Sequence, residues 1–197
     1  MKRIGLFGGT FDPVHLAHVA LARVALDQLQ LDQVRWIPTG RPWHKARSPT
    51  PAVHRAAMVG LAIADEPRFV LDRCEIDRGG ASYTYDTVRE LQAAQPGADW
   101  FLVIGQDQYA GLHTWLGWQK LLERVTLAVA NRPGAPLQAS PEVEQVAHHA
   151  VALPMMDISS THIRATAAAG QHIDALVPSA VARYIDQNHL YRGTHGN

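Results

Sequence analysis

The chain has 197 residues, which is long enough for one domain to bury a core without metals or disulfides. Lys plus Arg (18) balances Asp plus Glu (18), so no net positive field draws the protein to nucleic acid or to an anionic membrane. With 47% hydrophobic and 18% charged residues, the composition excludes a disordered or fibrous chain.

The first residues have the pattern of a βαβ unit. An apolar run over residues 4–7 predicts a strand, and apolar side chains at helical spacing over residues 15–28 predict the helix that follows it. A second run, over residues 34–37, predicts a parallel neighbour reached through that crossover helix. The same reasoning predicts helices over residues 52–64, 87–94 and 141–146, strands over residues 69–71, 101–104, 126–130 and 150–153, and a loop at Pro133, Gly134 and Pro136.

This alternation predicts an α/β fold, with a Rossmann-like, doubly wound, mainly parallel sheet and helices on both faces. From about residue 160 we expect a C-terminal helical extension, whose second helix covers residues 179–187. No linker or repeat divides the chain, so we expect a single domain over residues 1–197. Ligands bind such sheets at the carboxyl ends of the strands, which directs attention to the loops after Phe7, Ile37, Ile104 and Leu153.

The loop after the first predicted strand, residues 8–18, has the chemistry of a phosphate site. Gly8 and Gly9 allow the backbone to turn tightly and to approach a ligand, and the following helix N-terminus favours anions. His15 and His18 are three residues apart and therefore share one helix face. A metal-binding pair is the rival interpretation, but zinc ligands on one helix more often lie four apart and need a third ligand.

The loop after the last predicted strand has a complementary character. Ser159, Ser160 and Thr161 are residues that cap a helix start, and Arg164 lies one turn further on, where its guanidinium can face the same anion. The alternative is an ordinary capped helix with a solvated arginine.

Both loops resemble signatures of one enzyme superfamily. Residues 8–18 resemble the nucleotidyltransferase motif, a Gly-rich turn followed by His-x-Gly-His, with Ala17 in place of the usual glycine. Residues 158–164, Ile-Ser-Ser-Thr-His-Ile-Arg, resemble its second motif, Ile-Ser-Ser-Thr-x-Ile-Arg. Between them the chain resembles bacterial nicotinate-nucleotide adenylyltransferase in the stretches Pro42-Trp43-His44-Lys45, Ser82-Tyr83-Thr84 with Thr87, Ile104-Gly105-Gln106-Asp107, Thr114-Trp115 and Arg132-Pro133-Gly134, although Trp43 replaces the family's usual proline.

The resemblance covers residues 4 to about 192 and implies adenylyl transfer from ATP to nicotinate mononucleotide, a step of NAD biosynthesis, without a covalent enzyme intermediate. It implies His15, His18 and Arg164 as catalytic groups. The implied ATP site consists of Gly8, Gly9, Thr10, Phe11, His15, His18, Gly105, Asp107, Ser159, Ser160, Thr161 and Arg164. The implied mononucleotide site consists of Thr10, His44, Lys45, Tyr83, Thr84, Asp107, Trp115, Leu116 and Arg132.

In that site Trp115 would stack on the pyridine ring, and backbone N–H groups near Thr84 and Leu116 would bind its carboxylate; the alternative for Trp115 is a core tryptophan. Mg²⁺ is the expected cofactor, held by the ATP phosphates, with no dedicated protein metal ligand. ATP and nicotinate mononucleotide are the expected partners, without nucleic acid or membrane, and a homodimer is left open. The lone cysteine, Cys74, and the lack of an apolar run near the ~20 residues of a membrane span lead us to expect a cytoplasmic protein.

Three other interpretations compete with this one. The same fold and reaction could serve another acceptor, as in phosphopantetheine adenylyltransferase or a cytidylyltransferase, although Ser82-Tyr83-Thr84 and Thr114-Trp115 argue against it. A non-catalytic nucleotide sensor would be expected to have lost His18 or Arg164, and neither is lost. A dinucleotide-binding dehydrogenase would carry Gly-x-Gly-x-x-Gly after the first strand, and this chain does not.

Overall fold

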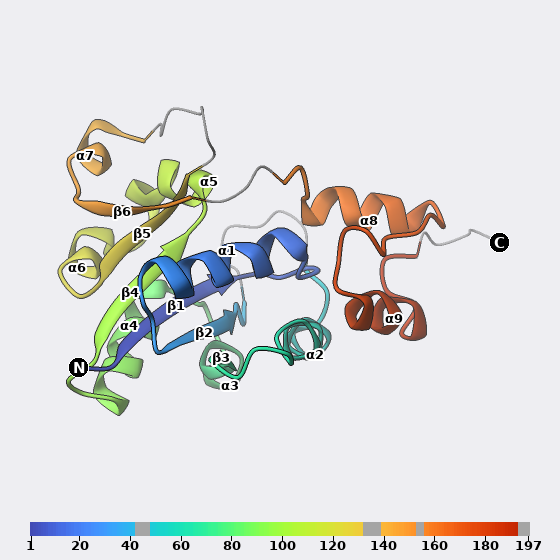
Figure 1. The fold of residues 1–197 in the computed structure, drawn as a ribbon, viewed down its shortest axis with the longest axis horizontal. Helices are drawn as coiled ribbons and strands as arrows, with labels where there is room; N and C mark the ends of the chain where they lie inside the picture. Colours follow the sequence, from blue (N-terminus) through green and yellow to red (C-terminus); the bar gives the residue numbers. More distant parts are fainter. Residues whose placement is uncertain (42–47, 132–138, 153–155, 193–197) are drawn as a thin grey trace.

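A six-stranded sheet forms the centre of the molecule. The computed structural model describes residues 1–41, 48–131, 139–152 and 156–192. The strands lie in the order β3-β2-β1-β4-β5-β6, and each pairs with its neighbours in parallel. The predicted Rossmann-like sheet is therefore confirmed, with every strand of the described residues parallel (Figure 1). The strands are β1 (Arg3–Gly9), β2 (Gln33–Pro38), β3 (Phe69–Leu71), β4 (Asp99–Ile104), β5 (Thr126–Asn131) and β6 (His148–Ala152).

Side chains along the inner strands of the sheet alternate between two cores. In β4, Phe101 and Val103 face one core, whereas Leu102 and Ile104 face the other. The first core is covered by α1 (Leu16–Gln28), α2 (Ala52–Ala62), α8 (Ser160–Ala168) and α9 (Ser179–Gln187), and the second by α4 (Thr84–Ala94), α5 (Gln106–Ala110), α6 (Trp118–Leu122) and α7 (Pro141–Glu144). The two-sided burial explains why the strands are nearly continuous apolar runs.

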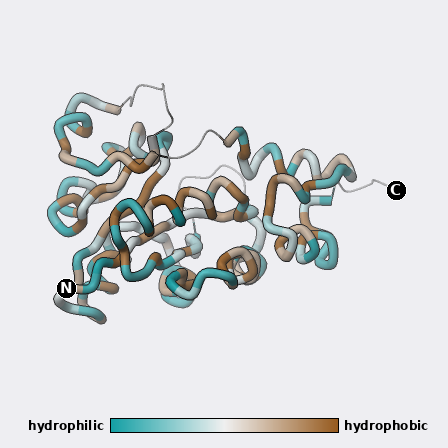
Figure 2. The backbone as a smooth tube through the Cα atoms, viewed as in Figure 1, coloured by the Kyte–Doolittle hydropathy of each residue, from teal (hydrophilic) through white to brown (hydrophobic). Residues whose placement is uncertain are grey.

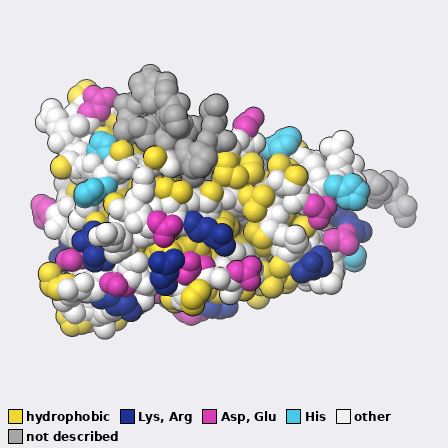
Figure 3. Space-filling view, viewed as in Figure 1, with side chains coloured by type: hydrophobic (Ala, Val, Ile, Leu, Met, Phe, Trp, Pro, Cys, Tyr) yellow, Lys and Arg dark blue, Asp and Glu magenta, His cyan; other side chains and the backbone are white. Residues whose placement is uncertain are grey.

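The hydropathy of the chain follows this layering. Figure 2 shows hydrophobic segments along the strands and the inner sides of the helices, with hydrophilic segments at the periphery. Figure 3 shows positive and negative side chains interspersed on one face, as the balanced charge would suggest. No described helix has both the length and the apolar character needed to cross a bilayer.

The C-terminal helices lie beyond the carboxyl end of β1 (Figure 1). α8 and α9 form the predicted helical extension, with turns rather than helix between them, and α9 packs on α2. The extension thereby borders the edge of the sheet where ligands are expected. That the chain is a single domain stays a prediction.

Local boundaries differ from the expected ones where elements are short. α3 (Cys74–Arg78), α5, the 3-10 helix at Leu112–Thr114 and α6 were not predicted, because five residues or fewer cannot display helical periodicity. The helix expected over residues 87–94 begins at Thr84, and β6 begins two residues before the expected strand over residues 150–153, whose last residue lies outside the described part. The loop at Pro133, Gly134 and Pro136 also lies outside it.

Candidate active site

A pocket of about 340 Å³ opens where the strand order reverses, at the carboxyl ends of β1 and β4. It brings most of the predicted site residues together: Gly8, Gly9, Thr10, Phe11, His18, Tyr83, Thr84, Gly105, Trp115, Leu116, Ser160 and Arg164 line it. Four others, His15, Asp107, Ser159 and Thr161, do not line it. His44, Lys45 and Arg132 lie outside the described residues, as does Trp43.

The two histidines of the first loop are held against each other at the start of α1. His15 is the residue that precedes the helix, and its backbone N–H donates to Nδ1 of His18 at 3.2 Å. The two rings stack with their centroids 3.6 Å apart, and Phe11 meets the ring of His18 edge-on. Because Nδ1 of His18 accepts a hydrogen bond, the neutral ring carries its proton on Nε2, the nitrogen that can donate to a phosphate.

Burial keeps both imidazoles uncharged. It lowers the pKa of His15 to about 4, and it lowers the pKa of His18 well below its usual value, with the neighbouring His15 adding to the shift. At neutral pH the pair therefore consists of neutral hydrogen-bond donors. A triphosphate bound beside them would raise both pKa values, because a nearby negative charge favours the imidazolium form.

The loop that begins α8 meets the first loop directly. The hydroxyl of Ser160 donates to the carbonyl of Pro13 at 3.0 Å, and Nη1 of Arg164 donates to the carbonyl of Asp12 at 2.7 Å. Ser159 caps α8 by accepting the His162 N–H. The two distant stretches therefore lie together and line one pocket, as expected, whereas their joint binding of a ligand stays a prediction. The fork of five N–H groups on an arginine leaves Arg164 donors that can face the pocket it lines.

Asp12 is the point at which the first loop is tied to the rest of the chain. Its buried carboxylate accepts the Thr50 N–H at 3.2 Å and the Tyr191 hydroxyl at 2.6 Å. Burial alone would raise the pKa of Asp12, but the hydrogen bonds from Thr50 and Tyr191, together with the charge of Arg164, bring it below its usual value. The carboxylate is consequently ionised and acts as an anchor for the loop.

A buried arginine, which the sequence did not single out, joins the loops after β1 and β2. Arg55 of α2 is only 1% exposed. Its guanidinium donates to the carbonyls of Thr50, Thr10 and Gly40 at 2.8, 2.8 and 3.2 Å. It lies within an Ala-rich helix, where an isolated arginine gives no local sign of burial.

Tyr83 and Thr84, at the start of α4, and Trp115 and Leu116, after the 3-10 helix, form another part of the pocket lining. Trp115 is half-buried: it packs against the second core and also lines the pocket. Its stacking on the pyridine ring stays a prediction. Leu116 also lines the pocket, and its side chain is 61% exposed.

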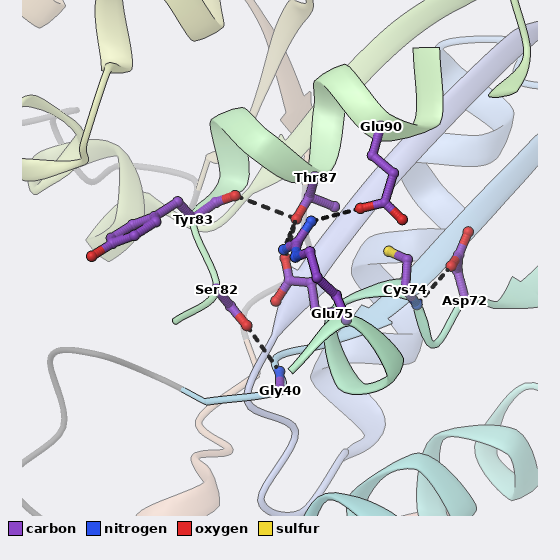
Figure 4. A network of polar contacts seen from close by, with 9 residues as sticks. Gly40, Asp72, Cys74, Glu75, Ser82, Tyr83, Thr87 and Glu90 are labelled. Atoms are coloured by element: carbon purple, nitrogen blue, oxygen red, sulfur yellow. Dashed lines mark hydrogen bonds and ion pairs between the residues drawn. The ribbon is translucent and has the colours of Figure 1, made fainter. Parts of the chain in front are cut away.

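A polar network that the sequence analysis missed also borders the pocket, which Glu75, Ser82 and Thr87 line (Figure 4). The hydroxyl of Thr87 donates to the carboxylate of Glu75 at 2.9 Å, and Arg78 donates to Thr87 and to Glu90. Ser82 accepts the Gly40 N–H at 3.2 Å. Burial raises the pKa of Glu75, and the bonds from Thr87 and Ser82 and the charge of Arg78 offset only part of that shift.

Two further positions can now be placed. Asp107 is exposed on the first turn of α5, whereas Gly105 and Gln108 line the pocket, so a role for Asp107 stays a prediction. Ala17 is half-buried and does not line the pocket. Within the described ranges, no three His, Cys, Asp or Glu side chains gather as metal ligands.

Comparison with known proteins extends this geometry. The cytidylyltransferase-like family model matches residues 6–166. A Methylibium petroleiphilum protein named probable nicotinate-nucleotide adenylyltransferase is 53% identical over 99% of this chain and 95% of its own length. A Bordetella petrii protein of the same name is 48% identical over 98% of this chain and 100% of its own length. The structure of Plasmodium falciparum nicotinic acid mononucleotide adenylyltransferase complexed with NaAD shares the fold, with a TM-score of 0.79 and 18% sequence identity. The match covers 97% of this chain and 98% of the Plasmodium chain.

Proposed function

The chain belongs to the nicotinate-nucleotide adenylyltransferases, within the wider cytidylyltransferase-like family, and we infer that its pocket transfers the adenylyl group of ATP to nicotinate mononucleotide. The products are nicotinate adenine dinucleotide and pyrophosphate, in a step of NAD biosynthesis. The observation that carries this conclusion is the contact of the two motif loops, Ser160 with Pro13 and Arg164 with Asp12, at the mouth of the pocket.

The proposed reaction is a direct in-line displacement at the α-phosphorus of ATP. An oxygen of the mononucleotide phosphate forms the new P–O bond, while the bond to the pyrophosphate oxygen breaks and its electron pair leaves with pyrophosphate. The attacking oxygen is already ionised, so no general base is needed. Catalysis then depends on orientation and on donors placed where negative charge grows.

We propose His18 and Arg164 as those donors, since both line the pocket. Nε2 of His18 would bind a phosphate oxygen, and the Arg164 guanidinium would bind another while its bond to Asp12 keeps it oriented. His15, whose backbone N–H fixes the ring of His18, is the second histidine of the pair. Ser160, near the start of α8, places the helix N-terminus beside the same anion.

The mononucleotide would occupy the end of the pocket lined by Tyr83, Thr84, Trp115 and Leu116. The indole of Trp115 offers a flat surface for the pyridine ring, and stacking of this kind is worth about 1–3 kcal/mol per base. The first N–H groups of α4, which begins at Thr84, favour a carboxylate. Contacts from His44, Lys45 and Arg132 to the mononucleotide remain predictions.

Magnesium is proposed to arrive with ATP. The described residues offer no cluster of protein ligands, and Mg²⁺ commonly keeps several waters and binds substrate phosphates instead. Held in this way, the ion would neutralise part of the triphosphate charge. The cytoplasmic location and a homodimer also remain predictions.

The function is tested by supplying ATP and Mg²⁺ with nicotinate mononucleotide, nicotinamide mononucleotide or phosphopantetheine in separate reactions and measuring pyrophosphate. We expect turnover with nicotinate mononucleotide and a dinucleotide product. Release with phosphopantetheine alone would favour a different acceptor. Release with none of the three would favour the nucleotide sensor.

A further inference from the structure

Glu75 has no part in the chemistry proposed above, although it is one of the residues that line the same pocket. The residue is 7% exposed and lies on the short helix α3. Burying a carboxylate costs free energy unless its oxygens accept hydrogen bonds, so the partners of this side chain indicate what it does.

The first partner is Thr87, one turn into α4. Its hydroxyl accepts the N–H of Arg78 at 3.0 Å, and its single proton has two acceptors in reach, the Glu75 carboxylate at 2.9 Å and the Tyr83 carbonyl at 3.3 Å. The carboxylate is the nearer of the two. Arg78 is held in turn by Glu90 at 2.7 Å. Figure 4 shows the carboxylate of Glu75 directed at this hydroxyl from below α4. Glu75 therefore fixes the first turn of that helix.

The second partner is Ser82, which precedes α4. Its hydroxyl accepts the N–H of Gly40, from the loop after β2, at 3.2 Å, and both Ser82 and the Gly40 N–H lower the pKa of Glu75 against the effect of burial. A Cβ on Gly40 would collide with the backbone carbonyl of Glu75, so the two backbones are in close contact. Glu75 thus joins the loop after β2 to the segment that leads into α4.

The residues between these two anchors include those proposed to bind the substrate. Tyr83 is extended (φ −106°, ψ 127°), and its carbonyl accepts the N–H groups of Asp86 and Thr87. Thr84 follows as the first residue of α4, and a first-turn N–H has no partner inside its own helix. The direction of the Thr84 N–H is therefore set by whatever holds Ser82 and Thr87.

We propose that Glu75 is a positioning residue for the mononucleotide, which holds Ser82 and Thr87 so that the backbone N–H of Thr84 meets the pyridine carboxylate. This inference rests on the proposed function. Arg78 supplies positive charge next to the network through Thr87, which limits the repulsion between Glu75 and an anionic ring. Glu75 acts through its neighbours and takes no part in the adenylyl transfer itself.

Glu75→Gln tests the proposal with little change in size. The amide oxygen can accept from one hydroxyl, but the NH₂ group cannot accept from the other, so one anchor is lost. We expect KM for nicotinate mononucleotide to rise about tenfold or more, because a misdirected hydrogen bond to a charged group costs about that much. KM for ATP and kcat at saturation should stay within about threefold.

Matched variants separate positioning from general damage. Thr87→Val removes the hydroxyl at constant shape and should reproduce the increase in KM for the mononucleotide. Thr87→Ser keeps the hydroxyl and should therefore keep the wild-type KM. Asp77→Asn, at an exposed carboxylate of α3 that pairs with Arg73 outside the network, should leave KM unchanged. The double variant Glu75→Gln/Thr87→Val should have a KM for nicotinate mononucleotide no higher than that of the single variant with the higher KM, as expected for residues that act through one network.

Calorimetric binding of nicotinate mononucleotide without ATP distinguishes the failure of this inference from the failure of the proposed function. Weaker binding by Glu75→Gln, with an unchanged urea midpoint, supports the inference even if turnover with this acceptor is absent. Equal affinity of the wild type and the variant would overturn it. Proportional increases in both KM values, or a wild type that does not bind the mononucleotide, would do the same.

Discussion

Replacing Tyr191 with Phe removes the hydroxyl whose hydrogen bond to Asp12 links the end of the described chain to the first motif loop. The phenol donates to Asp12 at 2.6 Å, and burial raises the pKa of Tyr191, so it stays protonated. Hydrogen bonds to charged groups contribute about 1.5–3 kcal/mol. We expect the free energy of unfolding at neutral pH to fall by about that amount.

The loss should depend on pH in a defined direction. Burial by itself raises the pKa of Asp12, but the bonds from Thr50 and Tyr191 bring it below the unfolded value of 3.8. The carboxylate therefore contributes stability that is complete above pH 3.8 and is lost as the pH falls through the folded value. The difference between wild type and Tyr191→Phe should be full at neutral pH and should shrink below pH 3.8.

Tyr184→Phe on α9 is the matched control. Its hydroxyl bonds to Nδ1 of His54 at 3.0 Å, away from the motif loops, and a neutral bond contributes about 0.5–1.5 kcal/mol. Urea midpoints and steady-state kinetics would be measured for both variants. Turnover should fall only in Tyr191→Phe, because Asp12 also orients Arg164. Equal midpoints and equal turnover in the two variants would refute this reasoning.

Three further outcomes follow from the site. His18→Ala should lower kcat about a hundredfold or more while the fold stays intact; near wild-type turnover would remove His18 from the mechanism. Trp115→Ala should raise KM for nicotinate mononucleotide by a factor that corresponds to the ~1–3 kcal/mol of a lost stacking contact, and should leave KM for ATP unchanged. An equal increase in KM for both substrates would contradict stacking. Gly40→Ala should lower the free energy of unfolding by about 1–3 kcal/mol, because the added Cβ meets the backbone carbonyl of Glu75. Gly60→Ala in α2, where the added Cβ makes only an ordinary contact, should be neutral or stabilising. Similar urea midpoints for the two variants would disprove the clash.

The sheet could be predicted because burial on both faces makes its strands continuous apolar runs. β1 and β4 carry their signal locally, and the glycine pair and the spacing of His15 and His18 mark the loop that follows β1. The contact between Ser160 and Pro13 spans 147 positions, but the placement of both loops after parallel strands was enough to predict their meeting.

What sequence reasoning missed is the support beneath the site. Arg55, Glu75 and Tyr191 are single polar residues whose burial depends on partners distant in the chain, such as Asp12, 179 positions from Tyr191. No local pattern distinguishes them from solvated residues. Glu75 in particular lies in a polar stretch. Its partner Thr87 belongs, with Ser82-Tyr83-Thr84, to the stretches that carry the family resemblance, but nothing in the sequence connects Thr87 with Glu75.

The central claim is that the loops at residues 8–18 and 158–164 together hold the triphosphate of ATP. It is tested most directly by a crystal structure with a non-hydrolysable ATP analogue and Mg²⁺. The account predicts phosphate oxygens within hydrogen-bond distance of both His18 Nε2 and the Arg164 guanidinium. A triphosphate that contacts neither residue, or contacts only one loop, would contradict it.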